Sequence, residues 1–142
     1  MPVVRNPQFN FKEGFCWTDI NSTFLKARLK GKGIFDVVSM SLFTKTQIPD
    51  WFYVTIINTS FMSLYVDNFI NNTSHFQIND ARQVPIVIPS ESQLKEAKHL
   101  FNNAFDIKCG QLRMELSEED ALVSLAKIET SVEALITRIY GI

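Results

Sequence analysis

The densest positive charge in this 142-residue chain is a set of four cationic residues within seven positions, Lys26, Arg28, Lys30 and Lys32. No acidic residue occurs between Asp19 and Asp36, and Lys45 follows further along the chain. Lysine and arginine side chains contact nucleic-acid phosphates, and Gly31 and Gly33 permit a close approach of the backbone. The segment predicts a phosphate-binding surface, with a solvated loop as the alternative.

A second polar pair, Arg82 and Gln83, has side chains suited to hydrogen bonds with base edges, although such pairs are common on protein surfaces. The candidate DNA-binding residues are therefore Lys26, Arg28, Lys30, Lys32, Lys45, Arg82 and Gln83. The five cations of the first group would position the protein on phosphates, and the second pair would read sequence.

One tetrapeptide, Asn6-Pro7-Gln8-Phe9, has residue types found in a catalytic loop. Adenine-modifying DNA methyltransferases use Asn/Asp-Pro-Pro-Tyr/Phe, in which the polar side chain holds the target amine and the ring stacks on the base. Here Gln8 replaces the second proline, and the residues before Asn6 leave no room for a cofactor-binding βαβ unit. We therefore expect an ordinary Asn-Pro turn.

The remaining polar residues do not have the spacing of a metal or nucleophile site. His75 and His99 lie 24 residues apart without carboxylate or cysteine companions at ligand spacing, so solvated or capping histidines are expected. The sequence contains no Gly-x-Gly-x-x-Gly and no other phosphate-cradling loop. We expect no catalytic residue, no metal and no cofactor in this chain, S-adenosylmethionine included.

Composition indicates a soluble protein with one domain, or one domain and a helical tail. The net charge is −1, yet residues 1–90 carry eight Lys/Arg against six Asp/Glu, and residues 91–142 carry six against nine. An anionic partner is therefore expected to meet the first part. Cys16 and Cys109 indicate reduced thiols in the cytoplasm, and no apolar run is long enough for a membrane span.

The Pro89-Ser90 pair divides the chain better than any other point. Residues 1–89 are expected to form a β-rich core, and residues 90–142 a helical segment that packs on that core or on a partner helix. The expected fold class is α+β, with a small mixed or antiparallel β-core and short helices, followed by two C-terminal amphipathic helices.

The β-rich part begins with a predicted strand or strand entry at residues 14–18. Ser22 can cap a helical turn through Phe24, Leu25 and Arg28, which the glycines that follow would end. Residues 34–43 are rich in β-branched and aromatic types and predict a further strand.

The run at residues 51–57, preceded by Pro49, fits a helix or a strand, because a short apolar run does not distinguish the two. A helix packed on one side is predicted next by the spacing of Phe61, Leu64, Tyr65 and Phe69. The prolines of residues 84–89 predict an extended segment at the edge of any sheet.

The second part predicts two amphipathic helices joined near residues 109–110. Ser90 with Gln93 makes a capping box, and Ser117 with Asp120 makes a weaker one. Apolar residues follow at helical spacing, namely Leu94, Ala97, Phe101 and Ala104, and then Ala121, Leu125, Ile128, Val132, Leu135 and Ile139. The second set, from Ala121 to Ile139, spans about three heptads, which indicates a helix packed on a partner.

Several segments, in order, resemble the specificity region of restriction-modification DNA methyltransferases. They lie at residues 15–20, 26–29, 35–43, 56–60, 69–89 and 128–142. Ala81-Arg82-Gln83-Val84-Pro85-Ile86-Val87-Ile88-Pro89 is similar to the family segment Ile-Arg-x-Leu-Pro-Ile-x-x-Pro. Ile56-Ile57-Asn58-Thr59-Ser60 resembles the helix end Leu/Ile-x-Leu-Asn-Ser, and Ile139-Tyr140-Gly141-Ile142 resembles the ending Leu-Tyr-Gly-Leu.

This resemblance implies the target-recognition region of an adenine-specific DNA methyltransferase from a bacterial restriction-modification or BREX-like phage-exclusion system, akin to type I restriction specificity subunits. It implies double-stranded DNA as partner and sequence recognition as function. It also implies a preceding methyltransferase domain that binds S-adenosylmethionine. Such a domain is absent from these 142 residues, so a carboxyl-terminal fragment or a remnant is expected.

Two hypotheses from other classes stay open at this point. A protein-interaction module would use the C-terminal helices for self-association or for another chain, and it would be indifferent to DNA. A complete small enzyme would need a convergent polar pocket, which the sequence does not locate.

Overall fold

The computed structural model describes residues 6–21, 24–33 and 39–142. Within these residues the chain forms a 3-10 turn, three strands and five helices: η1 (Pro7–Phe9), β1 (Gly14–Thr18), β2 (Ala27–Lys30), β3 (Ser39–Leu42), α1 (Asp50–Ile57), α2 (Ser60–Phe69), α3 (Ile78–Ala81), α4 (Glu91–Leu112) and α5 (Glu118–Tyr140). The predicted α+β class is confirmed, with a small antiparallel sheet and two long C-terminal helices. None of the described helices is both long and apolar enough to cross a membrane.

The three strands form one antiparallel sheet in the order β2-β1-β3. Trp17 lies opposite Ala27 on one side and Met40 on the other, and this row of side chains points into the core. Because side chains alternate along a strand, the neighbouring residues face the other way. We call that side the outer face; it carries Gly14, Cys16, Thr18, Arg28, Lys30 and Ser41, of which Cys16 is buried. Lys26 directly precedes β2.

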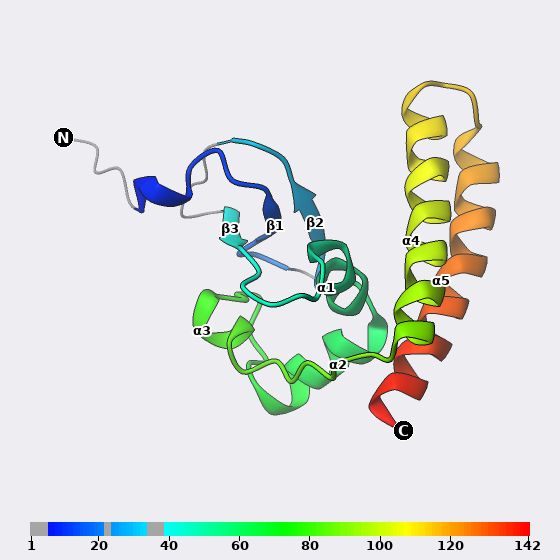
Figure 1. Cartoon of the computed structure of the whole chain (residues 1–142). Coiled ribbons are helices and arrows are strands. Elements are labelled where there is room, and N and C mark those ends of the chain that lie inside the picture. Colours follow the sequence, from blue (N-terminus) through cyan, green and yellow to red (C-terminus); the bar gives the residue numbers. More distant parts are fainter. Residues whose placement is uncertain (1–5, 22–23, 34–38) are drawn as a thin grey trace.

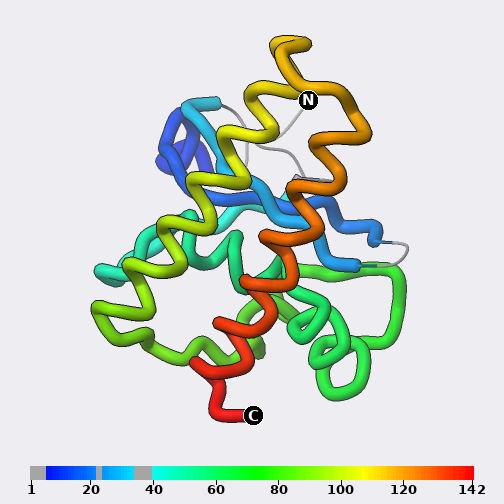
Figure 2. Tube along the Cα trace, turned by 90° about the vertical axis from the view of Figure 1, so that its right-hand side faces the viewer, coloured from blue at the N-terminus to red at the C-terminus, as the bar shows by residue number. Residues whose placement is uncertain are grey.

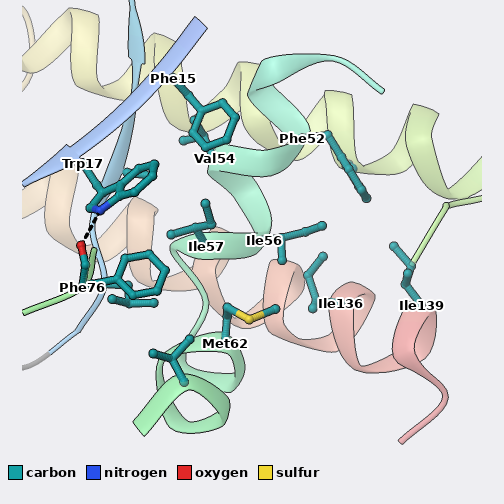
Figure 3. Close-up of a cluster of buried hydrophobic side chains, with 14 of the residues drawn as sticks. Phe15, Trp17, Phe52, Val54, Ile56, Ile57, Met62, Phe76, Ile136 and Ile139 are labelled. Carbon is teal, nitrogen blue, oxygen red and sulfur yellow. Dashed lines mark hydrogen bonds between the residues drawn. The ribbon is translucent and has the colours of Figure 1, made fainter. Parts of the chain in front are cut away.

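Helix α1 covers the inner face of the sheet and separates the sheet from the α4–α5 hairpin (Figure 1). The core beneath it brings together side chains from β1, α1, α2 and α5 (Figure 3). Phe52, Ile56 and Met62 are fully buried there, as are Leu135 and Ile136. Both parts of the chain thus share one apolar cluster.

Helices α4 and α5 lie side by side as an antiparallel hairpin whose tip extends past the sheet (Figure 2). The Ser90–Gln93 capping box is present, and Ser117 accepts a hydrogen bond from the Asp120 backbone N–H at 3.1 Å. The expected break near residues 109–110 is wrong, since α4 continues to Leu112. The chain reverses at Met114, which adopts the left-handed conformation, so no glycine is used for the turn.

The expected helical turn at residues 24–28 is also wrong for the part that the structure describes, because residues 27–30 form β2; its proposed cap, Ser22, lies outside the described residues. The Asn58 side chain pairs with the free edge of this strand, accepting from the Ala27 N–H at 2.6 Å and donating to the Ala27 carbonyl at 2.9 Å. Ser63 Oγ accepts from the Leu25 N–H at 3.0 Å. These partners from the α1–α2 region hold the segment extended.

The strand expected at residues 34–43 appears as β3 at Ser39–Leu42, and residues 34–38 lie outside the described part. The ambiguous run at 51–57 is helical, with Pro49 as its N-cap. Helix α2 is present, but its buried residues are Met62 and Val66, whereas Leu64 and Phe69 are 59% and 76% exposed. Phe61 and Tyr65 of the predicted face are half-buried and pack against the core, so the predicted face is right for these two residues and wrong for Leu64 and Phe69.

The segment at residues 84–89 has no strand partner and runs outside the sheet, so an edge position in the sheet is not observed. Helix α3, which the sequence analysis missed, begins at a capping box of Gln77 and Asp80. Glu133 of α5 accepts hydrogen bonds from the backbone N–H groups of Ser60 and Phe61 and so caps α2 from a distance. The Glu133 contacts tie the start of α2 to α5.

Candidate nucleic-acid interface

Two exposed cations lie at the edge of the sheet, Arg28 on β2 and Lys26 directly before it. Both side chains are exposed, while Leu25 and Ala27 beside them are buried, an alternation that ends at Leu29, which is 44% exposed. Among the described residues, neither cation is paired with a carboxylate, since the ion pairs there are His75–Asp19 and Arg138–Glu96. Lys32 is exposed in the turn after β2. This arrangement can attract a polyanion without first breaking an internal contact.

Lys30 belongs to the outer face but has a different surrounding. Its Nζ donates to the carbonyl oxygens of Lys12 at 2.9 Å, Gly33 at 3.1 Å and Gly31 at 3.3 Å. The same ammonium lies 5.6 Å from the centroid of the Phe43 ring. An ammonium has three donors, and here all three have carbonyl acceptors, so Lys30 holds the loop after β2 against the Lys12 segment. We leave it out of the phosphate-binding group.

Two stacked rings cover the end of the outer face next to Lys30. Gly14 makes this possible, because a Cβ there would lie 2.4 Å from the Leu42 carbonyl oxygen and 2.9 Å from the Phe43 ring. Phe43 stacks on Phe9 with ring centroids 5.1 Å apart and an interplanar angle of 17°. The Asn6-Pro7-Gln8-Phe9 segment is a turn, as expected, and this stacking occupies one face of its ring.

Lys45 is exposed in the loop between β3 and α1, at the rim of a cavity of about 350 Å³. The Asp50 carboxyl lines the same cavity, and its Oδ1 is buried without a hydrogen-bond partner among the described residues. Burial raises the pKa of Asp50 above its ordinary value; a hydrogen bond from the Thr44 backbone opposes this, and the Glu13 carboxylate adds to it. Lys12, Lys45 and Asp50 therefore line one cavity, and burial makes the charged form of the Asp50 carboxyl less favourable.

Arg82 and Gln83 lie at the end of α3, and both are exposed. Arg82 Nη1 donates to Asn79 Oδ1 at 3.2 Å, and Gln83 Nε2 donates to the Asn79 carbonyl at 3.1 Å. Helix α3 lies below the sheet in Figure 1, apart from β2. The predicted site residues thus form two separate groups, one on the outer face and its loops and one on α3.

The structure also gives His75 a carboxylate partner that sequence reasoning missed. His75 Nδ1 lies 3.0 Å from Asp19 Oδ2, and the two residues are 56 positions apart, so no local spacing could reveal the pair. Backbone bonds bring them together, including one from the Phe76 N–H to the Asp19 carbonyl at 2.8 Å. The described residues contain no group of three metal-ligating side chains, and we assign this pair to joining the loop before α3 to β1.

No family model matches this chain, and no curated protein matches it significantly. The candidate interface therefore depends on the geometry of the outer face and on the sequence motifs given above.

Proposed function

We propose that this chain is the target-recognition module of an adenine-specific DNA methyltransferase from a bacterial restriction-modification or BREX-like system, working in the cytoplasm. Its outer face would bind the backbone of double-stranded DNA. The observation that carries the proposal is the pair Lys26 and Arg28, which are exposed at the start of the edge strand β2 and form no ion pair among the described residues. The ordered motifs from residue 15 to residue 142 support the family.

The roles within the module follow from where the side chains lie. Lys26, Arg28, Lys32 and Lys45 would contact phosphates and position the duplex, because such contacts carry little sequence information. Arg82 and Gln83 would contact base edges from α3. A separate methyltransferase domain would bind S-adenosylmethionine and act on an adenine turned out of the duplex.

The small net charge of the chain is compatible with this role. Residues 91–142 carry nine acidic and six basic residues, and most of them belong to the α4–α5 hairpin. Helix α1 lies between that hairpin and the sheet (Figure 1). Acidic charge is therefore kept away from the outer face, where the local balance is positive.

Replacing Lys26 and Arg28 together by glutamine should weaken binding to all duplex sequences alike. Each phosphate contact contributes a slope of about −0.9 to log affinity against log salt, so the slope should become shallower by about two. Fluorescence anisotropy with a labelled duplex at several salt concentrations measures it. The matched control exchanges Lys95 and Lys127, which are exposed on the hairpin, for glutamine. An unchanged slope in the Lys26/Arg28 variant would contradict the proposal.

Replacing Arg82 and Gln83 by alanine should change the preferred sequence and leave the salt slope nearly intact, since base-edge contacts release few counterions. Enrichment from a randomised duplex library before and after the change measures the preference. Each good base contact contributes about 1–3 kcal/mol of discrimination, so its loss should be visible at one or two base pairs. Identical enrichment profiles would exclude a reading role for this pair.

A second function is favoured by one observation, the apolar tip of the hairpin. The exposed large side chains there are Phe105, Leu112, Met114, Leu122 and Val123. Exposed apolar groups of this kind mark protein-interaction sites when they form a patch. A chain that sediments as an oligomer and does not retain DNA would favour an interaction module over the recognition module.

A further inference from the structure

An exposed aromatic side chain precedes the two cations at the start of β2. Phe24 is 48% exposed. The residues after it alternate, because Leu25 and Ala27 are buried whereas Lys26 and Arg28 are exposed. In an extended chain, side chains two positions apart lie on the same side and about 6–7 Å from each other. The segment therefore presents one ring followed by two cations.

The Phe24 ring has no aromatic or cationic neighbour among the described residues. The two ammonium groups that lie over rings there cover Phe9 and Phe43 instead. Phe24 borders a shallow cavity of about 250 Å³ together with Leu64, which is itself 59% exposed. Because the ring provides most of the surface of a phenylalanine side chain, the exposure of Phe24 leaves ring surface open to a partner.

The backbone that carries this ring and these cations is held from behind. Ser63 Oγ accepts a hydrogen bond from the Leu25 N–H at 3.0 Å. The Asn58 side chain bonds both the N–H and the carbonyl of Ala27, at 2.6 and 2.9 Å. A segment that is already fixed in its extended form loses little conformational freedom on binding, so less of the interaction energy is spent on ordering it.

A ring beside two cations on a fixed segment suits a nucleic-acid strand whose bases are unpaired. Proteins that bind such strands combine cations that follow the phosphates with aromatic side chains on which bases stack. In a paired duplex each base is stacked between its neighbours, so only an unpaired base offers its face to Phe24. A purely apolar partner would leave Lys26 and Arg28 without an opposite charge, since neither has an ion pair among the described residues.

We propose that residues 24–28 bind unpaired DNA, with Phe24 stacked on one base and with Lys26 and Arg28 on phosphates of the same strand. The inference rests on the proposed function for its phosphate contacts. It adds a preference, because DNA with an unpaired stretch gains a stacking contact that a fully paired duplex lacks. Stacking of one base on one aromatic ring corresponds to about 5- to 100-fold in affinity.

The test measures the binding of the whole chain to three labelled DNAs of equal length by fluorescence anisotropy. They are a single strand, a paired duplex, and the same duplex with about six mismatched central pairs. The mismatched duplex should bind at least about fivefold more tightly than the paired one. Phe24→Ala should weaken binding to the single strand and to the mismatched duplex by at least about fivefold, and should change paired-duplex affinity by less than about twofold.

Two further variants separate stacking from other effects. Phe105→Ala is the matched control, since Phe105 is 53% exposed on the hairpin, and it should leave all three affinities unchanged. Phe24→Trp should keep the affinity, and single-stranded DNA should quench the fluorescence of the added indole beyond any change seen for Trp17 and Trp51 in the unsubstituted protein. Thermal melting checks that each variant remains folded.

Three results would overturn the stacking contact: equal affinity for paired and mismatched DNA, single-strand binding that survives in Phe24→Ala, or an equal loss in Phe105→Ala. The salt slope of Lys26 and Arg28 on the paired duplex tests the proposed function separately. A duplex slope that behaves as expected, together with no effect of Phe24, would reject the stacking contact and keep the recognition surface. Single-strand binding that needs Phe24, without any duplex binding, would keep this inference and reject the duplex function.

Discussion

Leu135→Asp should lower the free energy of unfolding by about 4–5 kcal/mol or prevent folding altogether. Leu135 is fully buried on α5 and belongs to the apolar cluster shared with α1 and α2. The change removes buried methyl groups and places a carboxylate where no cation is available in that cluster. Because single domains are stable by only about 5–15 kcal/mol, this loss is a large share of the total. Urea denaturation followed by circular dichroism measures it.

Leu122→Asp is the matched control for that variant. The residue lies on the same helix and is 58% exposed at the hairpin tip, so its change should alter stability by no more than about 0.5 kcal/mol. Should Leu135→Asp leave the denaturation midpoint unchanged, the α5 helix would not pack on α1 and α2 in the isolated chain. The apolar seam would then be reserved for another protein, as the interaction hypothesis requires.

The C-terminal hairpin was largely predictable from local sequence. Ser90 and Ser117 start their helices because each hydroxyl accepts a hydrogen bond from the backbone N–H three residues later. At the start of α4 the Gln93 side chain also accepts from the Ser90 N–H, which completes the capping box. The heptad pattern located most of the buried seam, including Leu135. The heptad pattern missed Ile136, which is fully buried. A heptad seam predicts the side of a helix that faces one partner, whereas α5 contacts both α4 and α2.

The candidate site was less predictable, because long-range contacts determine which cations are free. Nothing within the segment of Lys26 to Lys30 shows that Asn58, 31 residues beyond Ala27, holds it as a strand. Once it is a strand, alternation exposes Lys26 and Arg28 on one side. The role of Lys30 depends on the Lys12 carbonyl, 18 residues earlier in the sequence, and its charge alone could not reveal that role.

The cavity beside Asp50 shows the same limit more strongly. Its lining comes from the η1 region, the end of β3 and the first turn of α1, and no motif connects these segments in sequence. In the sequence alone, Asp50 is an acidic residue at a helix start, where a negative charge stabilises the helix. Only the fold shows that its Oδ1 is buried and has no hydrogen-bond partner among the described residues.

Trp17→Ala should lower the free energy of unfolding by about 3–5 kcal/mol, the usual range for a large buried aromatic. Trp17 is 1% exposed in the central strand and contacts the Phe76 ring with centroids 5.5 Å apart. Its Nε1 also donates to the Phe76 carbonyl at 2.8 Å, a bond that ties β1 to the loop before α3 (Figure 3). Differential scanning calorimetry measures the total effect.

Trp17→Phe separates the hydrogen bond from the packing. The smaller ring keeps much of the apolar contact but leaves the Phe76 carbonyl without its donor, so we expect a loss of about 1–3 kcal/mol. If Arg82 and Gln83 read bases from α3, loosening this anchor should also broaden the sequence preference in the library experiment. The salt slope should stay unchanged, because Lys26 and Arg28 flank Ala27, whose backbone is held by hydrogen bonds to the Asn58 side chain. A shallower slope with an unchanged preference would reverse the assignment of the two groups, with α3 on the phosphates and β2 on the bases.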